Sequence, residues 1–176
     1  MSDGLDRLLA SIGGVDGVVM VLGSVSGGFS NSGSISGEWG DGVSISVDTW
    51  GAADARADIV NSATGVITGG ETGFALNAGT VYGDLINDGQ ISGAGENTGV
   101  HIVAGTFNGD IVNNESITSP YDALFADIDT FNGSFTNTDS IAGGANGAVF
   151  VLGQMTGDFT NSGSISGEWA NGVDIS

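Results

Sequence analysis

The stretch NSGSISGEW occurs twice in this chain, at residues 31–39 and again at residues 161–169. The likeness extends further, because residues 17–46 and 147–176 share 20 of 30 positions when aligned without gaps. The two copies lie 130 residues apart in a chain of 176 residues. A long internal repeat of this kind indicates an architecture in which one structural unit recurs.

A shorter repeat lies inside the long one. In each short unit an asparagine stands two residues after a Phe, Ile or Leu. Successive asparagines are separated by 30, 26, 26, 24 and 24 residues, so five units make up the 130-residue repeat. The recurring asparagines are Asn31, Asn61, Asn87, Asn113, Asn137 and Asn161.

Each unit carries three apolar segments separated by turn-forming residues. The first shows the period-2 alternation of a strand with one buried face, as where Val43, Ile45 and Val47 alternate with serines. The second contains the asparagine. The third centres on an isoleucine, usually with a glycine two positions later, and these isoleucines are Ile35, Ile67, Ile91, Ile117, Ile141 and Ile165.

Three short strands per unit, with glycine at the bends, predict one coil of a β-solenoid. A strand with one apolar face cannot bury it alone, whereas stacking equivalent strands about 4.8 Å apart pairs every backbone and fills the interior with columns of like residues. The predicted fold is all-β, a right-handed parallel β-helix of about six coils of 24–30 residues. Right-handedness is favoured because the unit is longer than the coil of left-handed hexapeptide solenoids.

The domain organisation follows from the repeat. Residues 1–16 are expected to form an N-terminal cap or a partial coil, and residues 17–176 a single solenoid domain whose 130-residue repeat restarts at 147–176. The extra residues between the first two asparagines are expected to bulge out as a loop from Trp50 to Asp58. Because the chain starts and stops within a coil, we expect a fragment or a filament subunit.

The six asparagines are expected at an inward-facing corner of the coil. A buried polar side chain must be hydrogen-bonded. Asparagines stacked one coil apart can pair amide to carbonyl along the axis, as in cross-β ladders. The alternative is that they are exposed turn formers.

The charge of the chain excludes several partners. The formal net charge is −19, with Arg7 and Arg56 as the positive residues. Nucleic acids and anionic membrane surfaces would be repelled, so neither is an expected partner. No apolar run is long enough to cross a bilayer, so this segment is not expected to insert into a membrane.

The pattern N-x-G-x-I-x-G followed by G-V-x-I, seen at residues 31–37 and 42–45, resembles the β-helical passenger regions of bacterial autotransporters and related large repetitive surface adhesins. The resemblance covers roughly residues 12–176. It implies a stalk on the bacterial cell surface or in the extracellular space.

Catalysis is not expected, and we assign no catalytic residue. Lyases on β-helices commonly need a basic residue and cations, yet beyond the two arginines the chain offers only His101, which is expected to face solvent. Arg56 is expected to pair with a neighbouring carboxylate. Two carboxylate pairs could serve a glycosidase but are interpreted as exposed solubilising charge, namely Asp54 with Asp58 and Asp127 with Asp129.

No cofactor and no defined metal site are expected, apart from weak structural calcium. Acidic residues in outward turns could bind calcium together with backbone carbonyls. The candidates are Glu38, Asp41, Glu71, Asp84, Glu96, Asp110 and Glu168.

Tryptophans are the candidate contact residues. Trp39 and Trp169 occupy equivalent places in Gly-Glu-Trp. We expect them to pack on the coil surface, with projection toward a carbohydrate or a protein as the alternative. Trp50 belongs to the expected loop.

The functional hypothesis is a non-catalytic stalk or fibre module. Open solenoid ends expose unpaired strand edges, so chains are expected to stack end to end. The alternative is an adhesin-type module that recognises a glycan or host protein through an exposed side or the loop near Trp50.

Overall fold

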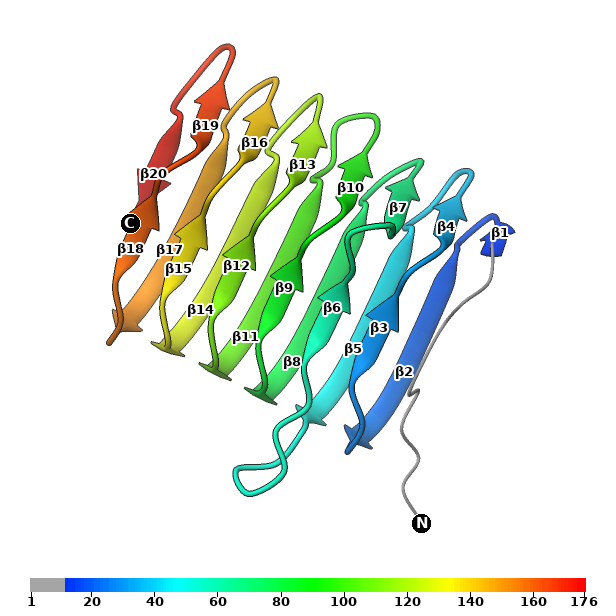
Figure 1. Cartoon of the computed structure of the whole chain (residues 1–176), viewed down its shortest axis with the longest axis vertical. Coiled ribbons are helices and arrows are strands. Elements are labelled where there is room, and N and C mark those ends of the chain that lie inside the picture. The colour runs from blue at the N-terminus through cyan, green and yellow to red at the C-terminus, as the bar shows by residue number, and fades with distance from the viewer. Residues whose placement is uncertain (1–11) are drawn as a thin grey trace.

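The computed structural model describes residues 12–176, which form a parallel β-solenoid with no helix (Figure 1). Each coil contributes one strand to each of three parallel sheets that run along the axis. The all-β solenoid expected from the repeat is confirmed. Residues 1–11 of the expected N-terminal cap lie outside the described residues, and residues 12–14 form a strand of the first coil.

The first sheet carries the isoleucines and has seven strands: β1 (Ile12–Gly14), β4 (Ser34–Gly37), β7 (Val66–Gly69), β10 (Gln90–Gly93), β13 (Ser116–Ser119), β16 (Ser140–Gly143) and β19 (Ser164–Gly167). The second sheet carries the longest strands: β2 (Val18–Val25), β5 (Val43–Trp50), β8 (Phe74–Tyr82), β11 (Val100–Asn108), β14 (Leu124–Asn132), β17 (Ala148–Met155) and β20 (Val173–Ile175). The third sheet carries the asparagines and has six: β3 (Phe29–Asn31), β6 (Ile59–Asn61), β9 (Leu85–Asn87), β12 (Ile111–Asn113), β15 (Phe135–Asn137) and β18 (Phe159–Asn161).

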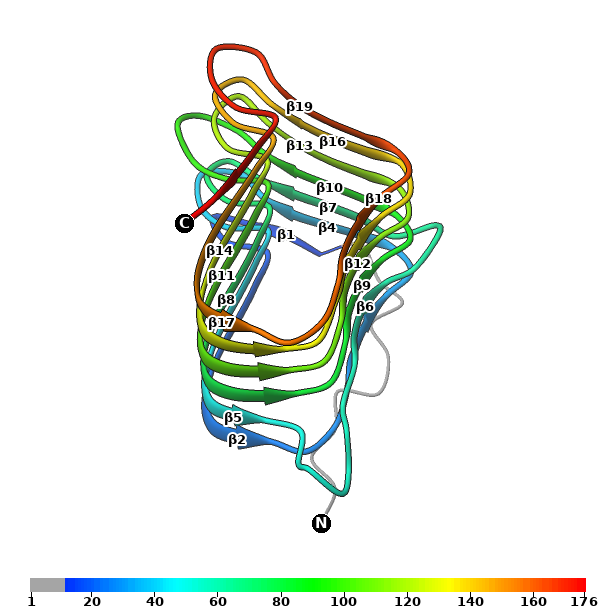
Figure 2. The same ribbon diagram turned by 90° about the vertical axis from the view of Figure 1, so that its left-hand side faces the viewer.

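The chain winds in a right-handed sense. Seen from the C-terminal end it runs counter-clockwise while it approaches the viewer (Figure 2). Two of the sheets have seven strands, so the solenoid has about seven coils rather than about six. The lower count came from the asparagine strands, which omit the partial coils that β1 and β20 add at the ends.

Equivalent residues stack in register through the whole rod. In the first sheet Ile35 pairs with Ile67, and Ile91 pairs with both Ile67 and Ile117. The isoleucines from Ile35 to Ile141 are at most 4% exposed, so they form one buried column. This packing removes apolar surface from water at every coil, which stabilises the fold by about 25 cal/mol per Å² buried.

The strands of the second sheet are longer than the sequence pattern indicated, because they turn a corner. In β8 the inward residues Leu76 and Ala78 are followed by two outward residues, Gly79 and Thr80, before Val81 turns inward again. Two consecutive outward residues shift the alternation by one position. Parallel pairing continues beyond the bend, so the strand remains continuous in register around the corner.

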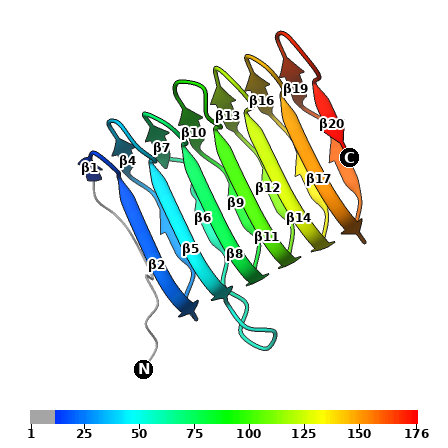
Figure 3. The ribbon, with the colours of Figure 1, turned by 180° about the vertical axis from the view of Figure 1, so that it is seen from behind.

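The predicted loop protrudes between β5 and β6, where it stands out from one edge of the rod (Figure 3). It begins at Gly51, whose φ of +70° lies in the left-handed region that glycine adopts readily. Trp50, however, is not part of it. This residue ends β5, and its side chain is 0% exposed inside the coil.

Glycine at the corner before the asparagine strand allows the coils to approach closely. A Cβ added to Gly109 would overlap the carbonyl oxygen of Gly83 in the preceding coil. A Cβ on Gly23 would lie 3.7 Å from its nearest neighbour, the Oδ2 atom of Asp48. Gly109 is therefore a site where a methyl group would clash, and Gly23 is a control site where it would not.

We expect Gly109→Ala to lower the free energy of unfolding by about 1–3 kcal/mol, because backbone must shift to admit the methyl group. Gly23→Ala should be neutral or stabilising by up to about 1 kcal/mol, since it restricts the unfolded chain without a clash. Urea unfolding followed by circular dichroism measures both. Equal stability of the two variants would contradict the close stacking of this corner.

Candidate functional site

The inward corner holds an uninterrupted ladder of the six asparagines. Each side-chain amide donates to the carbonyl oxygen of the asparagine one coil further on. From Asn31 to Asn161 the successive Nδ2–Oδ1 distances are 2.9, 2.9, 2.8, 2.7 and 2.8 Å. The first five side chains are at most 4% exposed, so the ladder lies inside the solenoid.

Further hydrogen bonds tie the ladder to the turn between the third and first sheets. The Asn61 amide also donates to the backbone carbonyls of Gly65, at 3.2 Å, and Gln90, at 3.2 Å. The Asn113 amide bonds in the same way to Glu115, at 2.6 Å. These buried and partly buried bonds fix the turn, since an unpaired amide there would lose its hydration without compensation.

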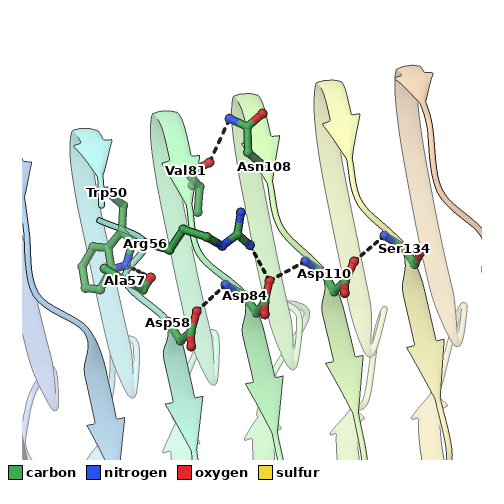
Figure 4. A network of polar contacts seen from close by, with 9 residues as sticks. All are labelled: Trp50, Arg56, Ala57, Asp58, Val81, Asp84, Asn108, Asp110 and Ser134. Atoms are coloured by element: carbon green, nitrogen blue, oxygen red, sulfur yellow. Dashed lines mark hydrogen bonds and ion pairs between the residues drawn. The ribbon is translucent and has the colours of Figure 1, made fainter. Parts of the chain in front are cut away.

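A second column of polar side chains lines the corner between the second and third sheets (Figure 4). Oδ1 of Asp58 accepts from the backbone N–H of Asp84 at 2.9 Å, and Asp84 accepts from Asp110 at 2.9 Å. The column continues through Ser134 to Asp158. Each member lies three residues before a ladder asparagine, so this spacing is the signal in the sequence that would have predicted the column.

Arg56 makes its ion pair across coils rather than within its loop. Its Nη2 atom lies 2.8 Å from Oδ1 of Asp84, and both side chains are partly exposed (Figure 4). A pairing with a carboxylate was expected, but among the loop residues Asp54 and Asp58. The stacking of the coils brings Asp84, 28 residues further along the chain, within reach of Arg56. Arg7 lies outside the described residues.

The three tryptophans occupy different environments. Trp39 is 73% exposed and Trp169 is 78% exposed, so the expected packing on the coil surface is wrong and both project. Trp50 was a candidate contact residue, and this assignment is also wrong. Its indole N–H donates to the carbonyl of Ala57 at 2.8 Å inside the coil. Trp50 holds the base of the protruding loop.

His101 lies on the outward face of β11 but is not fully solvated. Its ring packs edge-on against Phe125 with centroids 5.1 Å apart. Burial lowers the pKa of the imidazole below its ordinary value of 6.5, and the carboxylates of Asp41 and Asp127 offset only part of this effect. The ring borders a shallow hollow of about 290 Å³ whose lining includes Ser44, Ala75 and Asn77.

The carboxylates considered for catalysis or calcium are spread over the surface. Asp54, Asp58, Asp127 and Asp129 are all exposed. Within residues 12–176, no three His, Cys, Asp or Glu side chains come together in a group that could hold a metal ion. The same part of the chain contains no helix that is long and apolar enough to cross a membrane.

Comparisons with known proteins add no relative. A scan against protein-family models, a search of curated proteins and a search of solved structures all find no match to this chain. The resemblance to autotransporter and adhesin repeats therefore stays a prediction.

We expect Asn87→Ala to lower the free energy of unfolding by about 2–4 kcal/mol, because it removes two buried ladder bonds and leaves the carbonyl oxygen of Asn113 without the amide that donates to it. The matched control is Asn132→Ala, which removes an exposed bond of 3.0 Å to Asn108 and should cost less than about 1 kcal/mol. Thermal and urea unfolding measure both. A tolerated Asn87→Ala would show that the ladder does not stabilise the rod.

We expect NMR titration of the single histidine to give a pKa below 6.5. The unfolded chain then binds more protons than the folded one in the pH range between the folded pKa and 6.5. The stability contributed by neutral His101 is present above pH 6.5 and is lost as the pH falls through the folded pKa. In His101→Gln this part of the pH dependence should disappear. A titration midpoint above 6.5 would contradict the burial.

Proposed function

We propose that this chain is a non-catalytic structural module, a rigid β-solenoid spacer of a bacterial cell-surface or extracellular protein. One observation supports it most directly: parallel pairing continues without interruption from the first described coil to the last. The resemblance of residues 31–45 to surface-adhesin repeats supports the location.

A rod of this type suits a spacer because its length is set by the number of coils. Seven strands spaced about 4.8 Å apart give a sheet about 29 Å long. Each coil contacts its neighbours alone, so coils can be added without changing the others. The buried asparagine and isoleucine columns resist slippage, because a shift of one residue would turn every inward side chain outward.

The C-terminal end of the described rod presents a face that another coil would fit. Ile175 is 54% exposed, although Ile45 at the equivalent repeat position is 2% exposed. Phe159 and Ile165 are partly buried, and the strands β18 to β20 have no neighbour on their outer side. Unpaired strand edges and uncovered apolar side chains both favour association.

We infer that a second copy of the chain covers this face when the chain is isolated. Residues 17–46 repeat 20 of the 30 side chains of residues 147–176, so a second copy offers a coil with nearly the same interior. The net charge of −19 opposes contact side by side, which leaves growth along the axis. The result would be a stalk or fibre of constant width.

Electron microscopy and analytical ultracentrifugation should show rods of constant width that lengthen with protein concentration. Ile175→Lys places a charge on the end face and should leave monomers. Val151→Lys is the matched control, because Val151 is 38% exposed on the side of the rod and should not affect growth. A wild-type chain that stays monomeric at high concentration, or equal behaviour of the two variants, would contradict end-to-end stacking.

A further inference from the structure

The exposed aromatic side chains of residues 12–176 gather on one edge of the rod. Trp39 is 73% exposed, Tyr121 is 48% exposed and Trp169 is 78% exposed. All three lie in turns that lead from the first sheet to the second, after β4, β13 and β19. We call Trp39, Tyr121 and Trp169 the aromatic edge.

The aromatic edge is a row parallel to the solenoid axis. The turns from the first to the second sheet line up along one border of the molecule (Figure 1). Tyr121 lies three coils beyond Trp39, and Trp169 two coils beyond Tyr121. With strands about 4.8 Å apart, the turns are separated by about 14 and 10 Å along the axis. Any partner that contacts all three rings must therefore be extended.

Backbone hydrogen bonds to neighbouring coils hold these turns in place. The N–H of Trp39 donates to the carbonyl of Val15 at 3.2 Å, and that of Trp169 to the carbonyl of Gly144 at 3.0 Å. The carbonyl of Tyr121 accepts from the N–H of Ala145 in the next coil at 2.9 Å. Turns fixed before binding lose less conformational entropy when a ligand arrives, which favours a binding role.

The residues around the rings determine the chemistry of the partner. Each tryptophan follows an exposed glutamate, Glu38 or Glu168, whose carboxylate can accept hydrogen bonds. In the turns between the aromatic ones, the register places Glu71, Gly95 and Ala145 at the position of the rings, so the three rings stand apart. Isolated flat rings flanked by acceptors suit a ligand with alternating apolar ring faces and hydroxyl groups.

We propose that the aromatic edge binds a neutral, extended polysaccharide that lies along the solenoid axis. The C–H faces of its sugar rings stack on the aromatic side chains, and the glutamates accept hydrogen bonds from its hydroxyls. Anionic polymers are repelled by the net charge of −19. A protein partner fits less well, because three separated rings do not form the continuous apolar core of a protein interface. The inference is independent of end-to-end stacking, since the edge lies on the side of the rod.

The test measures binding of the folded chain to microcrystalline cellulose and to chitin, with immobilised heparin as the anionic comparison. We expect saturable binding to at least one neutral polymer and none to heparin. Trp39→Ala, Tyr121→Ala and Trp169→Ala should each weaken binding on the order of 2- to 10-fold, and the triple variant should not bind. Val21→Ala is the matched control, because Val21 is 75% exposed on another face and should bind normally.

Two further readouts separate a loss of binding from a loss of folding. Trp39→Tyr with Trp169→Tyr keeps flat rings at both positions and should retain most of the binding, even if the alanine variants prove unstable. Tryptophan fluorescence should change on binding in the wild type but not in this variant, where only buried Trp50 remains. Binding to neither neutral polymer, preference for heparin, or full binding by a folded triple variant overturns the proposal. A further outcome is that the wild type does not bind polysaccharide and the triple variant no longer self-associates. That result would assign the aromatic edge to a protein contact and would also overturn the proposal.

Discussion

The structure depends on the stacking of like residues directly over one another along a single axis. Strands of three or four residues, such as Ile59–Asn61, are too short to be stable alone. Each becomes stable because the coils on either side pair its backbone and cover its inward side chains. The asparagine ladder requires this stacking most strictly, because each buried amide donates to the asparagine of the next coil.

This constraint divides the sequence into two kinds of position. Inward positions must repeat, because a side chain has to match those above and below it. Outward positions and turns are free of that requirement, so they can carry features specific to this chain. The loop after Trp50, the ion pair of Arg56 with Asp84 and the aromatic edge all belong to this second kind. We therefore expect binding specificity in the turns and mechanical stability in the columns.

Much of the fold could be predicted because the residues at the inward positions recur in six successive units. The spacing of the asparagines and isoleucines indicated both the strands and their register. Trp50 was assigned to the loop formed by the extra residues between Asn31 and Asn61, whereas β5 bends at Asp48 and Thr49 and its last residue turns inward. Its stacking with Val25 and Val81, both inward, is the signal that would have placed it. The exposure of Trp39 and the partner of Arg56 depend on turn geometry and on neighbouring coils, which a linear pattern does not encode.

The central claim is that equivalent side chains of successive coils touch. The most direct measurement is a nuclear Overhauser spectrum of the asparagine side-chain amides in the assigned, labelled chain. Stacking predicts an unbroken series of contacts that links each ladder asparagine to the next, from Asn31 to Asn161. Amide contacts restricted to residues close in sequence, with no contact between asparagines 24–30 residues apart, would contradict the solenoid.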